Sequence, residues 1–135
     1  MQIFPYLCSM ISEKITKELL FCASDLLRKA PKIVIVTHMS PDGDAMGSSL
    51  GLGHTLRALF GSNVTNIVPN AYPSFLGWMP GAEQVLIYES QQPEAGLAIA
   101  EADLIICTDF NEPKRIGAIG ALLEQTVAAG KPCMV

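Results

Sequence analysis

This sequence of 135 residues has little of several features that mark particular classes of protein. Its four cysteines lie far apart, without the Cys-x-x-Cys spacing of a zinc site or the pattern of a disulfide framework. It has no apolar run long enough to cross a bilayer, and its first nine residues lack the basic start of a secretory signal. It also has no run of Lys or Arg, and its formal net charge is −4. These absences argue against a membrane partner and against tight binding to long duplex nucleic acid, and they favour the cytoplasm.

The residues that are present indicate one globular α/β domain. Half of them are hydrophobic and 16% are charged, a balance that supports a packed core. Short apolar, β-branched runs alternate with segments of helical periodicity. The expected strands are 33–37, 64–68, 85–88, 104–108 and the opening of a fifth at 133–135. The expected helices run from a Ser12 cap to 29, and over 44–60, 93–100 and 116–129. This alternation predicts a parallel sheet.

The stretch Ile33–Ser48 carries the first candidate site. Its apolar start is typical of a buried strand, and it runs into a turn that contains His38, Asp42 and Asp44. A helix follows, so the turn lies at the carboxyl end of a strand and the N-terminus of a helix, where open α/β sheets bind ligands. Imidazole nitrogen and carboxylate oxygen are ligands of divalent metals. Residue types and spacing also allow a polar turn whose aspartates only cap the helix.

A second polar cluster follows the strand predicted at 104–108. Asp109 stands just past the end of that strand, as His38 does after the first. If the two strands are neighbours, the Asp109 carboxylate faces the aspartates of the first turn and could bridge two cations. Two divalent ions can activate water for phosphate hydrolysis. Taken alone, Asp109 is more simply a strand-end cap. Arg115 could meet a substrate phosphate or equally pair with Glu112.

The helix predicted over 44–60 begins at this candidate site. Ser48 could donate to a phosphate from the helix N-terminus, or it could only pack in a helix of small residues. Gly47, Gly51 and Gly53 each lower helix propensity by roughly 1 kcal/mol relative to Ala. We therefore expect them to mark a close approach between this helix and a strand.

The turn-rich loop that begins at Pro69 contains three aromatic residues, Tyr72, Phe75 and Trp78. Aromatic rings can stack on a nucleobase. Aromatic residues in loops more often cover the core, and that is the expectation for this loop.

The segment His38–Ser48 is similar to the first motif of the DHH phosphoesterase superfamily. Its form, His-x-x-Pro-Asp-Gly-Asp-Ala-x-Gly-Ser, most resembles the subgroup of oligoribonucleases and 3′-phosphoadenosine-5′-phosphate phosphatases. Asp109, followed by Arg115-x-Gly117, resembles the second motif of the family. The resemblance covers residues 10–135.

This resemblance implies a three-layer, parallel-sheet α/β catalytic domain that binds two Mn²⁺ ions, with Mg²⁺ or Co²⁺ as other candidates. It implies hydrolysis of short oligonucleotides or nucleoside 3′,5′-bisphosphates, and it allows a homodimer of the complete protein. His38, Asp42 and Asp109 would bind one metal, and Asp44 with Asp109 the other. A pyrophosphatase or exopolyphosphatase of the same superfamily is a neighbouring alternative.

The sequence departs from the family at one large feature, because the Asp-His-His triplet that names the family is absent. The segment Gly130–Val135 resembles the run-up to that triplet. We therefore expect residues 10–135 to be the N-terminal part of a catalytic domain that is incomplete at its C-terminus, lacks the C-terminal substrate-binding domain and is inactive alone. We also expect Met10 to be the natural start and residues 1–9 to be an added tail. A noncatalytic nucleotide- or metal-binding α/β module is the competing interpretation.

Overall fold

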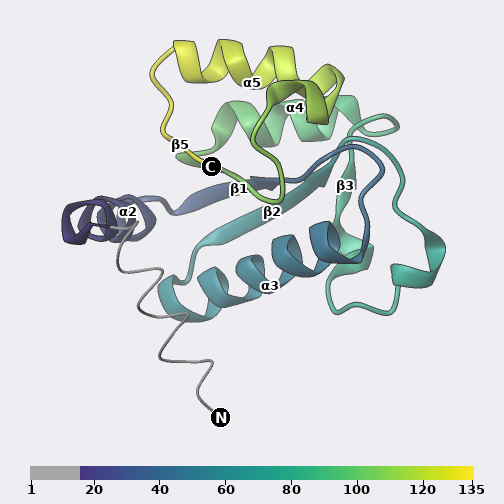
Figure 1. Cartoon of the computed structure of the whole chain (residues 1–135), viewed down its shortest axis with the longest axis horizontal. Coiled ribbons are helices and arrows are strands. Elements are labelled where there is room, and N and C mark those ends of the chain that lie inside the picture. Colours follow the sequence, from purple (N-terminus) through teal and green to yellow (C-terminus); the bar gives the residue numbers. More distant parts are fainter. Residues whose placement is uncertain (1–15) are drawn as a thin grey trace.

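A parallel sheet of five strands forms the centre of the computed structural model, which describes residues 16–135 (Figure 1). The strands are β1 (Lys32–Val36), β2 (Asn63–Val68), β3 (Leu86–Ile87), β4 (Leu104–Cys107) and β5 (Cys133–Met134). Their spatial order is β3-β2-β1-β4-β5, and every neighbouring pair is parallel. The predicted strands and the predicted parallel sheet are confirmed, although the third strand is shorter than expected.

Helices cover both faces of the sheet and complete the three layers. They are α2 (Lys17–Lys29), α3 (Gly43–Phe60), α4 (Gln92–Glu101) and α5 (Ala118–Ala128), with short 3₁₀ turns at Ser74–Leu76, Ala82–Gln84 and Pro113–Ile116. Figure 1 shows α4 and α5 together on one face of the sheet and α3 on the other. None of these helices is long and apolar enough to cross a bilayer.

The core consists of layers on the two faces of the central strands. Val34 and Ile105 pack in the cluster that includes residues of α4 and α5. Their neighbours Ile33 and Leu104 point to the opposite face and pack in the cluster with residues of α2 and α3. Successive side chains of a strand point to opposite faces, so a strand covered on both faces needs an uninterrupted apolar run. This requirement explains why β1 and β4 were recognisable from sequence.

The first described helix begins later than predicted. Thr16 is the N-cap of α2, and its hydroxyl accepts a hydrogen bond from the backbone N–H of Leu19 over 3.1 Å. Ser12, which we expected to be the cap, lies outside the described residues, as does the proposed tail at residues 1–9.

The glycines of α3 divide into two kinds. A Cβ atom on Gly53 would lie 2.9 Å from Oδ1 of Asn66 in β2, so the expected close approach is confirmed there. The expectation is wrong for Gly47 and Gly51, where an added Cβ would meet nothing within 4 Å. These two glycines are exposed, so close packing against a strand does not explain them.

Candidate metal centre

The order of the strands brings the two predicted halves of the site together. After β1 the chain builds β2 and β3 on one side, and it then returns to place β4 on the other side of β1. The carboxyl ends of the two strands at such a reversal form the usual ligand-binding crevice of open α/β sheets. Val36 of β1 pairs with Cys107 of β4, and His38 and Asp109 each lie two residues further on. The sheet register therefore sets these two residues beside each other.

Three predicted ligands converge at this crevice. The His38 Nε2 atom lies 3.2 Å from Asp109 Oδ2 and 4.0 Å from Asp42 Oδ1. One ligand atom from each of the three residues lies within 4.8 Å of the others. His38 is buried, whereas both aspartates are exposed. The cluster is therefore closed on the side of the imidazole and open to solvent on the side of the carboxylates. One imidazole nitrogen and two carboxylate oxygens are a suitable donor set for a divalent metal such as Mn²⁺.

The orientation of the His38 ring follows from a backbone contact. Its Nδ1 atom lies 2.8 Å from the carbonyl oxygen of Met39. A carbonyl oxygen can only accept, so Nδ1 carries the hydrogen in this contact. In its neutral form the ring then presents the Nε2 lone pair to the two carboxylates. This is the arrangement in which proteins present histidine to a metal.

Asp42 is also the N-cap of α3. Its Oδ1 atom accepts hydrogen bonds from the backbone N–H groups of Ala45 over 2.9 Å and Asp44 over 3.0 Å. The bond from Ala45 is the largest cause that lowers the pKa of Asp42 below its ordinary value, and the bond from Asp44 adds to it. The side chain is thus held as a carboxylate at the positive end of a helix. The capping interpretation and the metal interpretation both fit this residue.

The two loops of the site have unusual backbone conformations. Ser40 and Asp109, with φ of 53° and 62°, are the non-glycine residues with positive φ in the described part of the chain. Residues other than glycine seldom adopt this region, and such strained conformations occur often at functional sites. Two hydrogen bonds to other parts of the chain hold the loop that follows β1. Ser40 donates its backbone N–H to Asn70 Oδ1 over 2.7 Å, and Met39 donates to the Arg115 carbonyl over 2.7 Å.

Asn70 is a residue of the site that the sequence analysis missed as such. It follows the last residue of β2 by two positions, where the sequence alone predicts only a turn-rich loop that begins at Pro69. Its position after a strand that neighbours β1 was the available signal, because the carboxyl ends of parallel strands share one edge of the sheet.

The remaining predicted site residues lie outside the three-residue cluster. Asp44 is exposed in the first turn of α3 and does not belong to the cluster. The Ser48 hydroxyl donates to the carbonyl of Ala45 over 3.3 Å. Arg115 is exposed, and its side chain forms no ion pair with Glu112. Its backbone carbonyl, however, accepts the hydrogen bond from the Met39 N–H that holds the loop after β1.

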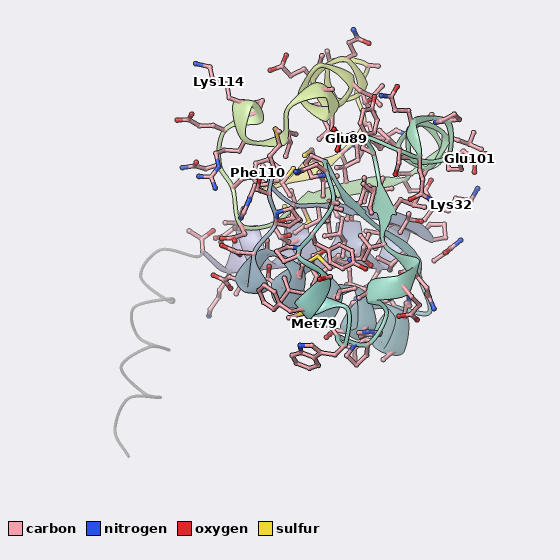
Figure 2. The ribbon with its side chains drawn as sticks, turned by 90° about the vertical axis from the view of Figure 1, so that its right-hand side faces the viewer. Lys32, Met79, Glu89, Glu101, Phe110 and Lys114 are labelled. Atoms are coloured by element: carbon pink, nitrogen blue, oxygen red, sulfur yellow. The ribbon has the colours of Figure 1, made fainter. Side chains whose placement is uncertain are left out.

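Figure 2 views the molecule from the side on which the strands end. Phe110, which follows Asp109, is labelled in the upper part of this view, and Met79 of the loop after β2 is labelled in the lower part.

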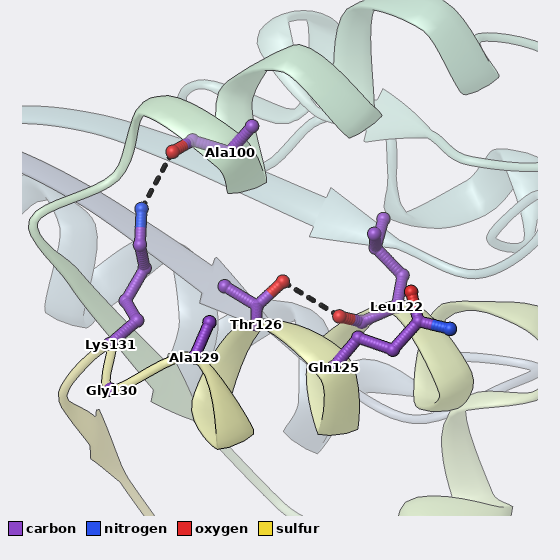
Figure 3. Close-up of a pocket in the computed structure, with 7 residues that line it drawn as sticks. All are labelled: Ala100, Leu122, Gln125, Thr126, Ala129, Gly130 and Lys131. Carbon is purple, nitrogen blue, oxygen red and sulfur yellow. Dashed lines mark hydrogen bonds between the residues drawn. The ribbon is translucent and has the colours of Figure 1, made fainter.

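A surface hollow of about 520 Å³ lies away from this site, between α5 and the end of α4 (Figure 3). None of the predicted site residues lines it. Its one cationic side chain, Lys131, donates to carbonyl oxygens at the end of α4, among them that of Ala100 over 2.6 Å. This lysine is therefore engaged as a helix cap.

Comparison with known proteins agrees with the resemblance seen in the motifs. Residues 32–130 match the model of the DHH family, N-terminal domain. The bifunctional oligoribonuclease and PAP phosphatase NrnA of Thermus thermophilus is 36% identical over 84 residues, which are 62% of this chain and 23% of that protein. The crystal structure of an exopolyphosphatase-related protein from Bacteroides fragilis is 46% identical with a TM-score of 0.78, over 87% of this chain and 33% of that one.

The chain thus spans about a quarter of the curated relative and a third of the solved structure. Since the family model matches most of the chain, and the fold and the first motif agree with it, the chain belongs to the DHH family.

Proposed function

We propose that this chain provides the metal-binding part of a phosphoesterase that hydrolyses short oligonucleotides or nucleoside 3′,5′-bisphosphates. The observation that carries the proposal is the convergence of His38, Asp42 and Asp109, whose ligand atoms lie within 4.8 Å of one another. The NrnA relative is named for two activities, oligoribonuclease and PAP phosphatase, and both substrates contain phosphate esters. Mn²⁺ is the proposed metal, with Mg²⁺ and Co²⁺ as other candidates.

Electrostatics support a cation at this position. Because Nδ1 of His38 is committed to the Met39 carbonyl, Nε2 of the neutral form of the ring is an acceptor, and it lies 3.2 Å from the carboxylate of Asp109. Two acceptors at that distance repel each other unless a proton or a metal ion lies between them. Asp42 adds a second carboxylate, whose Oδ1 lies 4.0 Å from the same Nε2 atom. A divalent metal would satisfy all three groups at once.

The residues have distinct proposed roles. His38, Asp42 and Asp109 hold the first metal, and Asp44 contributes with Asp109 to a second. A bound metal supplies an activated water and neutralises charge on the phosphoryl oxygens. Ser48 and Arg115 are proposed to contact the substrate phosphate, Ser48 from the first turns of α3 and Arg115 from the exposed loop before α5.

We expect the 135-residue chain to bind metal without catalysing turnover. The described residues hold one cluster of three metal-ligating side chains, which leaves a second metal with Asp44 and the shared Asp109. Residues 10–135 are therefore proposed to be the N-terminal part of the catalytic domain of a longer enzyme. Hydrolysis of a nucleotide by the purified chain with Mn²⁺ would contradict this part of the proposal.

Calorimetric titration with Mn²⁺ tests the proposal directly. The key variant is Asp42→Asn with Asp109→Asn, which keeps the side-chain shapes and the helix cap but removes both charges. A matched control, Glu89→Gln with Glu124→Gln, removes two exposed carboxylates that lie outside the cluster. We expect the wild type and the control to bind Mn²⁺ and the site variant to lose binding. Equal binding by all three proteins would overturn the proposal.

Inorganic polyphosphate is a second candidate substrate, because the solved neighbour that is 46% identical is described as exopolyphosphatase-related. A metal-bound phosphate group is common to both candidates. They differ in whether the substrate has a base, so a residue that contacts the base would distinguish them.

A further inference from the structure

The loop between β2 and the 3₁₀ turn Ala82–Gln84 presents two aromatic rings to solvent. Phe75 is 73% exposed and Trp78 is 76% exposed. The expectation that the aromatics of this loop cover the core is therefore wrong for these two. It is confirmed for Tyr72, which packs beside the cluster around Met46 and donates its hydroxyl to the Ala82 carbonyl over 3.0 Å.

These two rings are carried by a rigid turn. Leu76, which lies between them in the sequence, is only 4% exposed and anchors the turn in the core. Successive backbone bonds of 2.9–3.1 Å join Leu76 to Pro73, Gly77 to Ser74 and Met79 to Leu76. Phe75 lies in the 3₁₀ turn Ser74–Leu76, and Trp78 lies in the turn that directly follows it, so both rings belong to the same hydrogen-bonded segment.

The loop that carries Phe75 and Trp78 contacts the candidate metal centre at two points. Leu76 Cδ2 lies 3.9 Å from the place that a Cβ atom on Gly43 would occupy, and Gly43 stands between Asp42 and Asp44. Asn70, at the start of the same loop, accepts the backbone N–H of Ser40. A ligand held at the Asp42 carboxylate would therefore have this loop as a direct neighbour. Met79 marks the loop in the lower part of Figure 2.

The chemistry of the loop points to a base and not to a phosphate. Residues 69–81 contain no charged side chain, so they offer no cation to a phosphate group or to an anionic membrane surface. Exposed aromatic rings are instead the groups on which nucleobases stack in single-stranded nucleic acids, with little preference for sequence.

We propose that Phe75 and Trp78 form a stacking platform for the base of a nucleotide substrate whose phosphate is held at the metal centre. This inference rests on the proposed function and extends it, because it assigns the site to nucleotides and not to inorganic polyphosphate. A base-free chain of phosphates would gain nothing from either ring.

Trp78 is the only tryptophan of the chain, so its fluorescence reports on the platform alone. The probe is adenosine 3′,5′-bisphosphate with Mn²⁺, and inorganic tripolyphosphate with Mn²⁺ is the base-free comparison. We expect saturable quenching by the bisphosphate and much weaker quenching by tripolyphosphate. Phe75→Ala should weaken bisphosphate binding by roughly 5- to 100-fold, the range for loss of one base–aromatic stack, and leave tripolyphosphate binding unchanged.

Phe21→Ala is the matched control, because Phe21 is 74% exposed on α2, at the opposite end of the molecule in Figure 1. Its bisphosphate affinity should equal that of the wild type. Bisphosphate binding that survives Phe75→Ala, or equal quenching by tripolyphosphate, would overturn the platform. So would a dimer in sedimentation that dissociates on Trp78→Ala without a change in nucleotide affinity measured by calorimetry.

The Mn²⁺ titration separates this failure from a failure of the proposed function. If the wild type binds Mn²⁺ but its Trp78 fluorescence is quenched equally by the bisphosphate and by tripolyphosphate, only the stacking platform is contradicted. A wild type that binds neither Mn²⁺ nor nucleotide would contradict both.

Discussion

The side chains of His38 and Asp109 lie within 3.2 Å of each other, although 71 positions separate them in the chain. The pairing of Val36 with Cys107 places both residues two positions beyond matched points of parallel strands. Their contact is therefore set by the central sheet and less by the conformation of the loops. A shift of either strand by one residue would turn its side chain to the other face and separate the pair.

Asp42 is expected to show two separable roles, in metal binding and in capping α3. Asp42→Asn keeps an oxygen that can accept from the backbone N–H groups of Ala45 and Asp44, whereas Asp42→Ala removes it. We expect both variants to weaken Mn²⁺ binding at least about tenfold, since even changes behind the ligands have effects of that size. Asp42→Ala should lower the melting temperature more than Asp42→Asn, which keeps the capping oxygen and loses only the charge. Calorimetry and thermal unfolding of both variants check this, and equal melting temperatures would contradict the capping role.

The pH dependence of stability gives an independent test of the same cap. The pKa of Asp42 is lowered from 3.8 in the folded chain, chiefly by the N–H of Ala45. Its contribution to stability is therefore complete above the ordinary value and is lost as the pH falls through the lower folded value. We expect the difference in melting temperature between the wild type and Asp42→Asn to shrink as the pH drops below about 4. A constant difference down to pH 2 would contradict this prediction.

Most of the fold was predictable because its signals are local. The apolar runs of β1 and β4 are buried on both faces, and the turn at Asp42 has the residues of a helix cap. The strand order was not predictable from these signals, since it depends on which elements pack on each face. Without that order, the meeting of His38 and Asp109 remained conditional on the two strands being neighbours.

The details of the site depend on geometry that residue types do not encode. Asp42 and Asp44 are alike in the sequence, but only Asp42 belongs to the three-residue cluster. Likewise, Tyr72 packs against the core whereas Phe75 is exposed, although both are aromatic residues of the same loop. The positive φ of Ser40 is a tertiary effect, supported by Asn70 from another strand end.

The glycines of α3 should respond in opposite ways to alanine. Gly51→Ala meets nothing within 4 Å and should stabilise the chain by up to about 1 kcal/mol through helix propensity. Gly53→Ala places its Cβ 2.9 Å from Asn66 Oδ1. Asn66 is buried and fixed by two bonds of 2.8 Å from its Nδ2 to Ser49, so it cannot move away easily.

We therefore expect Gly53→Ala to destabilise the chain by about 1–3 kcal/mol, as overpacking does in cores. Urea unfolding of the two variants measures the difference. If both variants change the free energy of unfolding by the same amount and in the same direction, Asn66 moves aside to accommodate the added methyl group.

Lys131 is expected to stabilise the end of α4. Its ammonium group donates to the carbonyl of Ala100 in the last turn of α4 (Figure 3) and to the carbonyl of the C-cap residue Ala102. Carbonyls at a helix C-terminus have no partner within the helix. Lys131→Met keeps the length of the side chain but removes the donor, and should cost about 1–3 kcal/mol. Lys114→Met, at an exposed lysine, should change the free energy of unfolding by less than about 0.5 kcal/mol. Equal effects in urea unfolding would contradict the capping role.

Cys133 is expected to be an unusually reactive thiol. Its Sγ lies 3.8 Å from that of Cys107, and both residues are half-buried. The hydrogen bond from Cys107 lowers the pKa of Cys133 to about 7, and the same bond raises the pKa of Cys107. Cys107 thus keeps its proton and stabilises the Cys133 thiolate.

The rate of alkylation of Cys133 by iodoacetamide, followed by peptide mass spectrometry, should therefore rise with pH around a midpoint near 7. Cys107→Ala removes the donor and should move this midpoint upward, toward the 9.0 of an ordinary thiol. Cys107→Ser keeps a hydroxyl that can donate, and should preserve much of the shift. A profile that is the same in the wild type and in Cys107→Ala would show that the Cys107 thiol does not stabilise the Cys133 thiolate.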